Sequence, residues 1–522
     1  MPAWATPAHA VGTPAAGQQV TVSVALALRN AAAAEQLAAA VSTPGSAQYG
    51  RYVTPAQFNA RFAPTATEVS QVKSFLGSQG LTSTSVAAGN RWVTATGSVA
   101  TVSKAFGVTL RTYSYNGKHL YAPSADASVP SSIRSSVLAV NGLDQSGLLR
   151  HPLAQRVAPD GAKPAAAPAP AKCSSYWSQH SQTLPPAYPS DSTGRDSWPT
   201  YICGYTPDQM QSAYGVKGAI AKDRDGYGVR VAIIDAYASP TMRQDANRYS
   251  RDNGLPTFKN GQYREKTFRP FNLQSACGGE AGWNVEETLD VESVHSMAPG
   301  ANILYVGAKN CDTGIDGALN YVVQQRAADM VSNSYGNLGE AVPASEINVE
   351  HSIFVQAGAE GIGMYFSSGD SGDEFANTGV TQPDYPASDP KVTAVGGTSL
   401  AVNAAGGYQF ETGWGSSIDF VNSTGDGYDA PPPGDFAFGA GGGASTIFKQ
   451  PDYQRGVVPA NLSHRGSGPA MRVSPDVAAN ADPYTGFLVG QTSGGVYSTF
   501  AIGGTSLACP LFTGVQALVS QG

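Results

Sequence analysis

The chain has 522 residues, more than one hydrophobic core comfortably accommodates, so two or more domains are expected. Its net charge of −7, its 14% of charged residues and its 60 glycines and 35 prolines favour a loop-rich, secreted globular protein and exclude a nucleic-acid-binding one. The most alanine-rich stretch is interrupted by Arg29 and Glu35, so no segment is predicted to span a membrane.

The N-terminal stretch, MPAWATPAHAVGTP, has neither the charged nor the long apolar region of a complete signal peptide. Its ATPAHA portion contains the small residues that are typical of a signal-peptide cleavage site. Two interpretations stay open: the natural start lies upstream of this chain, or the stretch is a disordered leader.

Residues 17–145 alternate between strand-like and helix-like patterns. The stretch QQVTVSVALAL alternates like a strand, whereas NAAAAEQLAAAVS and ATEVSQVKSFLGSQ have helical periodicity. Hairpin strands are predicted at NRWVTATG and at RTYSYNGKHLYAP, with a turn at Asn116-Gly117. This order predicts a small α+β domain, followed by a Pro/Ala-rich, protease-accessible linker at residues 156–172.

From Cys173 onward, buried strand-like runs alternate with helical segments. The runs are VRVAIIDAY, ANILYVGA, DMVSNSYG, GIGMYFSSGD and KVTAVGGTS. Continuous apolar strands of this kind predict a parallel sheet with helices on both faces. Functional groups of such sheets gather at the carboxyl ends of the strands, where the pattern places Asp235 and Asp370.

The five cysteines form two pairs of sequence neighbours and one single residue. We expect disulfides between Cys173 and Cys203 and between Cys277 and Cys311, and therefore an oxidising compartment. Cys509 lies in the apolar run LACPLFTGVQALV, where a buried structural thiol is expected rather than a reactive one.

The sequence GGTSL occurs twice, and each copy presents a serine, Ser399 or Ser506, in a small-residue loop of the kind that exposes nucleophiles. A nucleophilic serine needs a base, yet none of the seven histidines lies in a His-Gly-Thr motif of the subtilisin type. A metal site is not predicted either, because no His-Glu-x-x-His motif occurs. His295 is expected to pack or to cap a helix.

A helix predicted at about 284–296 carries Glu286 and Asp290 one turn apart, so the two carboxyls point the same way. Apolar residues flank them on both sides, which favours an embedded pair with raised, coupled proton affinities. Spacing alone favours a solvated acidic face instead, and Glu287 and Glu292 are expected to lie on such a face.

In chain order, VEETLDVE, SSGDSG and GGTSLACP resemble the three signature segments of the sedolisin, or serine-carboxyl peptidase, family. SMAPGANI and SPDVAANADPYTG are similar to its framework, and STPGSAQYGRYVTPAQFNARFAP resembles its pro-kumamolisin-type activation domain. The resemblance covers nearly the whole chain. It implies an α/β, subtilisin-like fold with a parallel sheet, preceded by a small α+β, ferredoxin-like prodomain.

The resemblance also implies a role for each catalytic residue. Only the second GGTSL copy continues with ACP, so Ser506 is the implied nucleophile, Glu286 its general base and Asp290 the residue that orients Glu286. Asp370 would complete an oxyanion hole, which requires a protonated carboxyl because a carboxylate only accepts hydrogen bonds.

Two further residues match framework positions of the family and are left out of the catalytic set: Ser399 and Asp235. The segment SNSYG resembles the strand that aligns the substrate, with Tyr335 at a position where tryptophan is frequent in the family.

The implied protein is a secreted, acid-acting serine endopeptidase made as a self-processing zymogen. Residues 17–145 would be the activation prodomain and intramolecular inhibitor, 146–172 a linker containing the activation cleavage, and 173–522 the peptidase domain. The same catalytic set also serves tripeptidyl-peptidases, so that activity stays an alternative. A non-catalytic binding or scaffold protein is an alternative of another class.

The family continues past its nucleophile into a calcium-binding loop, whereas this chain ends at residue 522, and a truncated C-terminus is therefore expected. Calcium is expected from the resemblance, with its ligands beyond that residue and no other cofactor. The expected partners are protein or peptide substrates, with no nucleic acid or membrane, and the chain is expected to be a monomer.

Overall fold

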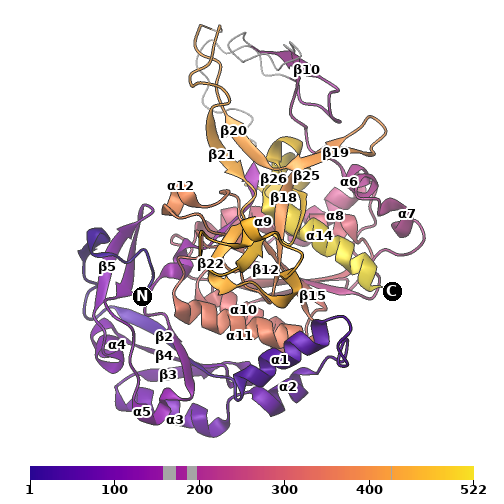
Figure 1. Cartoon of the computed structure of the whole chain (residues 1–522). Helices are drawn as coiled ribbons and strands as arrows, with labels where there is room; N and C mark the ends of the chain where they lie inside the picture. The colour runs from indigo at the N-terminus through magenta and orange to yellow at the C-terminus, as the bar shows by residue number, and fades with distance from the viewer. Residues whose placement is uncertain (157–171, 185–196, 425, 522) are drawn as a thin grey trace.

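The computed structural model describes residues 1–156, 172–184, 197–424 and 426–521. In Figure 1 the N-terminal part of the chain, in indigo and purple, lies against a larger part built around a second sheet. The Pro/Ala-rich linker expected at 156–172 falls almost entirely outside the described residues.

The N-terminal part contains an antiparallel sheet with the strand order β3-β4-β2-β7. Its strands are β2 (Gln19–Leu26), β3 (Thr82–Val86), β4 (Trp92–Ser98) and β7 (Val137–Asn141). Between β2 and β3 come α1 (Ala31–Ser42), α2 (Pro55–Phe62) and α3 (Ala66–Ser78), and between β4 and β7 come α4 (Val99–Phe106) and α5 (Ser131–Arg134). This β-α-β-β-α-β order confirms the ferredoxin-like prodomain.

The alternating valines of β2 explain why this part has a core of its own. Val22 and Val24 are fully buried, and they pack in one cluster with Leu76 of α3. The predicted hairpin is also confirmed: β5 (Leu110–Tyr115) and β6 (Lys118–Pro123) pair antiparallel, and β1 (Ala10–Gly12) adds to β5. Its turn residues, Asn116 and Gly117, have φ angles of 46° and 68°, which a tight hairpin requires.

The larger part is built on an eight-stranded sheet with the order β13-β14-β12-β15-β17-β18-β19, and with β24 beside β18. The strands are β12 (Arg230–Ala236), β13 (Tyr263–Thr267), β14 (Asn302–Ala308), β15 (Met330–Asn333), β17 (Gly363–Ser367), β18 (Thr393–Val402), β19 (Tyr408–Gly413) and β24 (Val477–Asn480). All neighbours pair in parallel except β18 and β19. The predicted parallel sheet is confirmed, with one antiparallel edge strand.

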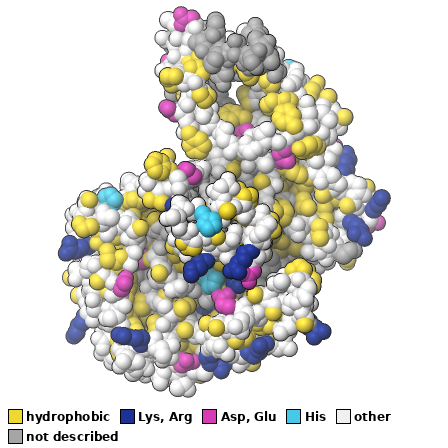
Figure 2. Space-filling model, viewed as in Figure 1, with side chains coloured by type: hydrophobic (Ala, Val, Ile, Leu, Met, Phe, Trp, Pro, Cys, Tyr) yellow, Lys and Arg dark blue, Asp and Glu magenta, His cyan; other side chains and the backbone are white. Residues whose placement is uncertain are grey.

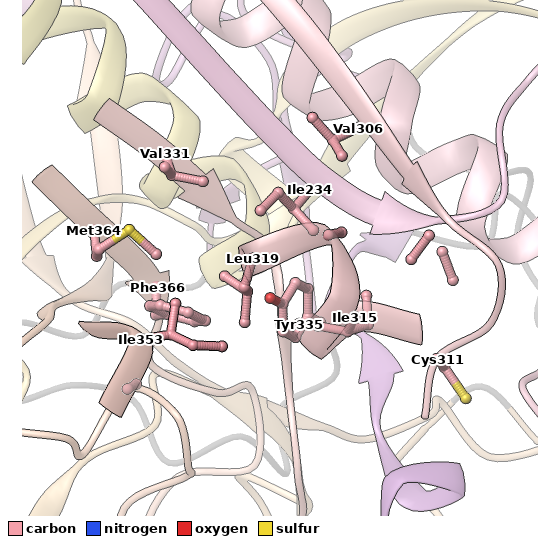
Figure 3. Packing of buried hydrophobic residues seen from close by; sticks show 14 of the residues in the cluster. Ile234, Val306, Cys311, Ile315, Leu319, Val331, Tyr335, Ile353, Met364 and Phe366 are labelled. Atoms are coloured by element: carbon pink, nitrogen blue, oxygen red, sulfur yellow. The ribbon is translucent and has the colours of Figure 1, made fainter. Parts of the chain in front are cut away.

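Helices cover both faces of this sheet. They are α10 (Thr313–Gln324) and α11 (Ala344–Glu360) on one face, and α8 (Met242–Asp252), α9 (Gly279–Met297) and α14 (Thr505–Ser520) on the other. Strand β12 shows why, because Ile234 packs on the α10 side and Ile233 on the α9 side, each fully buried. Figure 3 shows Ile234 beside Leu319 and Tyr335 on the α10 side. This two-sided burial gives the subtilisin-like fold.

Smaller elements surround the sheet. The strand pairs are β10 (Ser181–Thr183) with β11 (Ser197–Pro199), β20 (Gly415–Ile418) with β21 (Asp435–Gly439), β22 (Gly443–Lys449) with β23 (Met471–Ser474), and β25 (Phe487–Ser493) with β26 (Val496–Gly503). The short helices are α6 (Pro207–Ala213), α7 (Lys217–Ile220), α12 (Phe375–Thr378) and α13 (Ala460–Ser463).

Both predicted disulfides are present. Cys173 is bonded to Cys203 and Cys277 to Cys311, and Cys509 is buried as a free thiol, as expected. Within the described ranges, no helix is both long and apolar enough to cross a membrane. Figure 2 shows acidic and basic side chains interspersed over a mostly uncharged face, in keeping with the low charge content.

The two parts are joined by apolar and ionic contacts. Helix α1 lies along α11, and its Leu37 and Val41 share a cluster with Val355. His351 of α11 is 2.7 Å from both Glu35 of α1 and Asp389. Although burial opposes it, these two carboxylates raise the pKa of His351 to about 10. The prodomain is therefore docked on the outer side of α11.

Candidate active site

Four segments that are far apart in the sequence meet at the carboxyl edge of the main sheet. They are the end of β12, the middle of α9, the turn after β17 and the N-terminus of α14. Helix α9 is buried on every side from Glu286 onward, because it packs on β12 and β14 of the sheet, beside α14 and α8, and is covered by α6 and β25. Its acidic residues are consequently removed from water.

Ser506 is the second residue of α14. Its hydroxyl lies 3.4 Å from the carbonyl oxygen of Ser334 and is close to the carboxyl of Glu286, whose Oε1 has no hydrogen-bond partner among the described residues. Burial raises the pKa of Glu286 well above its ordinary value, nearby Asp235 raises it further, and the neighbouring Ser506 hydroxyl lowers it. The arrangement places a proton acceptor directly beside a serine hydroxyl.

Asp290 lies one helical turn after Glu286, and its Oδ1 accepts a hydrogen bond of 2.7 Å from Ser334 Oγ. Burial raises the pKa of Asp290 well above its ordinary value, and the carboxyls of Asp235 and Glu286 raise it further. Buried carboxylates repel one another, so Asp235, Glu286 and Asp290 are not all ionised at the same time. At least one of the three carboxyls keeps its proton, and the three titrate as a coupled set.

Asp235, near the end of β12, is the third carboxyl of the group. It is fully buried, burial raises its pKa well above the ordinary value, and neither oxygen has a hydrogen-bond partner among the described residues. The family resemblance alone left Asp235 outside the catalytic set. Its place at the end of a buried strand was the signal that could have put it beside Glu286 and Asp290.

Asp370 lies in the turn after β17 and faces the N-terminus of α14. Its Oδ1 accepts hydrogen bonds of 2.8 Å from both the backbone N–H and the hydroxyl of Thr505, whereas Oδ2 accepts none from the described residues. Burial raises the pKa of Asp370 to about 7, although the bonds from Thr505 lower it. Below neutral pH the carboxyl is therefore mostly protonated and can donate a hydrogen bond through Oδ2.

The chain's own residues 151–156 run between Glu286 and Asp370. Strand β8 (His151–Pro152) pairs antiparallel with β16 (Tyr335–Gly336), and β9 (Gln155–Arg156) pairs with the end of β26. Between the two short strands, the backbone N–H of Ala154 donates to Glu286 Oε2 at 2.9 Å. The Leu153-Ala154 peptide bond thus lies beside the implied base.

The carbonyl oxygen of Leu153 lies on the side of Asp370. A Cβ atom on Gly504 would overlap this oxygen and would stand 2.8 Å from Asp370 Oδ2, so both oxygens border the same small space. Gly504 also has a φ of 101°, which other residues rarely adopt. The Leu153 side chain is buried, and its Cδ1 would be 3.5 Å from a Cβ on Gly336.

The predicted solvated acidic face is wrong. Glu287 and Glu292 are fully buried, where they accept hydrogen bonds from the backbone N–H groups of Ser239, at 2.5 Å, and Gly490, at 2.8 Å. The loop after β12 and strand β25, which both cover α9, supply these donors, and helical spacing does not reveal such distant elements. His295 is buried and packs on Phe258, which confirms its expected packing role.

Ser399 lies in β18, and its hydroxyl donates to Asp482 Oδ2 at 2.7 Å. In the part of the chain that the structure describes, no group of three His, Cys, Asp or Glu side chains could hold a metal ion. The residues present therefore do not fit the expected calcium, and no step of the chemistry is assigned to it.

Two family models match the chain. The one described as "Pro-kumamolisin, activation domain" matches residues 7–146, and the one described as "Subtilase family" matches residues 274–522. The solved structure of Pseudomonas sedolisin, a serine-carboxyl proteinase complexed with pseudo-iodotyrostatin, is 28% identical, covers 61% of this chain and 80% of that one, and has a TM-score of 0.48.

Curated relatives extend the likeness over almost the full length. Sedolisin of Pseudomonas sp. (strain 101) is 30% identical over 96% of this chain and 76% of its own length. Xanthomonalisin of Xanthomonas sp. (strain T-22) is 28% identical over 96% of this chain, which spans 57% of that protein. The chain therefore belongs to the sedolisin family of serine-carboxyl peptidases and carries that family's activation prodomain.

Proposed function

We propose that the chain is the zymogen of a secreted endopeptidase that acts in acid and that first cleaves its own Leu153-Ala154 bond. One observation carries this proposal: the bond lies between Glu286, which accepts the N–H of Ala154, and Asp370, which borders the carbonyl oxygen of Leu153. A peptide held in this way has the orientation of a substrate.

Ser506 attacks the carbonyl carbon while Glu286 takes the proton of its hydroxyl. The tetrahedral intermediate then collapses, Glu286 returns the proton to the leaving nitrogen, and an acyl-enzyme remains on Ser506 until water hydrolyses it. The 2.9 Å contact between Glu286 Oε2 and the Ala154 nitrogen is the path of that second transfer. Asp290 and Asp235 act through Glu286, because the proton that they share sets its basicity.

Asp370 donates a hydrogen bond to the developing oxyanion while its carboxyl is protonated. Its pKa of about 7 keeps it in this form at acidic pH. The raised pKa of Glu286 has burial as its main cause, and residues 151–156 contribute to that burial. In the occupied cleft the hydrogen bond from the Ala154 N–H favours the carboxylate, so Glu286 can act as the base of self-cleavage. In the mature enzyme the departure of these residues admits water, which keeps Glu286 a competent base in acid.

The path of the occupying segment favours an endopeptidase over a tripeptidyl-peptidase. Residues pair with the cleft on both sides of the bond, through β8 before it and β9 after it. A tripeptidyl-peptidase would instead recognise a free amino terminus three residues before the bond. This bond lies within the linker at 146–172, which joins the prodomain at 17–145, the releasable inhibitor, to the peptidase domain at 173–522. Two disulfides support an oxidising, extracellular location.

The test is incubation of the purified chain at about pH 4, with intact-mass analysis and N-terminal sequencing of the products over time. We expect a fragment that begins at Ala154, and no such fragment from the Ser506→Ala variant. The processed protein should then cleave an N-acetylated peptide of residues 149–157, LRHPLAQRV. Cleavage of free but not of acetylated peptides would favour the tripeptidyl-peptidase, and no cleavage at any pH would favour a scaffold protein.

A further inference from the structure

Arg150 lies three residues before Leu153 in the segment that occupies the cleft, yet its side chain is only 1% exposed. Its Nη2 is 2.6 Å from Glu346 Oε1 and 2.9 Å from Glu350 Oε1, and its Nη1 is 4.0 Å from Asp316 Oδ1. Nη1 also donates to the carbonyl oxygen of Cys311 at 3.4 Å. Three carboxyls of the peptidase domain thus surround a single cation of the pro-segment.

The carboxyls stand on rigid elements that also align the segment. Asp316 belongs to α10, and Glu346 and Glu350 lie one turn apart on α11. The guanidinium lies 5.6 Å from the centre of the Tyr335 ring, and Tyr335 belongs to β16, which pairs with His151–Pro152. Figure 3 shows Tyr335 held among the buried side chains of the core. The backbone register therefore determines which residue of a bound peptide reaches the carboxyls.

The carboxyls around Arg150 are buried, so their ionisation depends on a cation beside them. Burial raises the pKa of Glu346 to about 8 and that of Glu350 well above its ordinary value, whereas Arg150 lowers both. Asp312, Lys309 and the prodomain's Asp144 also face the group. Buried carboxylates without a partner are costly, so these side chains hold either a cation or protons.

We propose that Asp316, Glu346 and Glu350 form a subsite that selects substrates with an arginine or lysine three residues before the residue whose carbonyl is attacked. In the zymogen Arg150 fills this subsite, and in the mature enzyme a substrate that pairs with β16 in the same register places its own side chain there. Arginine is favoured over lysine, because a planar guanidinium can contact two carboxylates at once. The inference rests on the proposed function.

The experiment measures cleavage of acetylated LRHPLAQRV peptides by the processed protein, with arginine, citrulline, lysine or alanine at the position of Arg150. Citrulline has nearly the shape of arginine but carries no charge. At pH 5 we expect kcat/KM to be about 10- to 100-fold higher for arginine than for citrulline, mainly through KM, as for other charged hydrogen bonds. The ratio should be larger at pH 7 than at pH 4, because burial raises the pKa of Glu346 to about 8 and that of Glu350 well above its ordinary value, so these carboxyls ionise as the pH rises.

Enzyme variants locate the source of the selection. In Glu350→Gln the arginine-to-citrulline ratio should fall close to one while cleavage of the citrulline peptide is retained. Glu346→Gln provides a second variant with the same expectation. Glu360→Gln is the matched control, because Glu360 lies on α11 but bonds to Gln356 instead of Arg150.

Equal cleavage of the arginine and citrulline peptides would overturn the subsite and leave the proposed peptidase standing, with Arg150 serving only to anchor the prodomain. An arginine-to-citrulline ratio that is unchanged in both Glu350→Gln and Glu346→Gln would also overturn the subsite. If no peptide is cleaved, the proposed function fails and the subsite fails with it.

Discussion

Replacing Asp370 with asparagine tests whether the active site depends on a neutral hydrogen-bond donor. Asp370 Oδ1 accepts two bonds from Thr505, and Oδ2 borders the carbonyl oxygen of Leu153. An asparagine can keep both contacts, with its oxygen towards Thr505 and its amide N–H towards the carbonyl. It cannot titrate.

The size of the effect follows from the pKa of Asp370, which burial raises to about 7. A carboxyl with that pKa is about 99% protonated at pH 5 and about 10% protonated at pH 8. Because the donor is the protonated form, its contribution is complete in acid and is lost as the pH rises through 7. In Asp370→Asn the alkaline limb of the activity profile should therefore move upward, whereas Asp370→Ala should lose roughly 10²- to 10³-fold in kcat at acidic pH, where the wild-type carboxyl is protonated.

The assay is hydrolysis of the acetylated LRHPLAQRV peptide from pH 3 to pH 9, after activation of each variant with a trace of processed wild-type protein. The wild-type profile should be bell-shaped and centred below pH 5. Its acid limb should report the ionisation of the coupled carboxyls of Glu286 and Asp290. Asp373→Asn, an exposed change in the same turn, is the control. A folded Asp370→Asn variant with an unchanged alkaline limb would refute the role given to Asp370.

Three further predictions follow from the same geometry. Ser506→Ala should reduce peptide hydrolysis on the order of 10⁶-fold, whereas Ser399→Ala, which loses only a bond to Asp482, should keep its kcat; equal losses in both would contradict the assignment. Gly504→Ala should block self-processing as seen on gels, because its methyl group would overlap the carbonyl oxygen of Leu153, and normal processing would show that this carbonyl lies elsewhere. The released fragment 1–153, added back, should inhibit the mature enzyme more strongly at pH 6 than at pH 4, and inhibition that is independent of pH would exclude a role for the carboxyls around Arg150.

The sequence by itself determined the regular elements and the family. Apolar runs such as VRVAIIDAY identified the strands of the parallel sheet, because a strand covered on both faces is apolar at every position. Asn116-Gly117 identified a hairpin, since both residues tolerate positive φ angles. Cysteine spacing identified both disulfides. Each of these signals is local, and a short stretch of chain is enough to express it.

Only the tertiary structure decided which of these residues meet. Glu287 and Glu292 look solvated by spacing, yet a distant loop and strand β25 bury them and supply backbone N–H donors. Asp235 resembled a framework residue until the sheet brought it beside Asp290. Arg150 showed no pattern at all before it was found between α10 and α11. Such contacts join residues that are tens to hundreds of positions apart, and packing of the whole domain creates them, so no local periodicity encodes them.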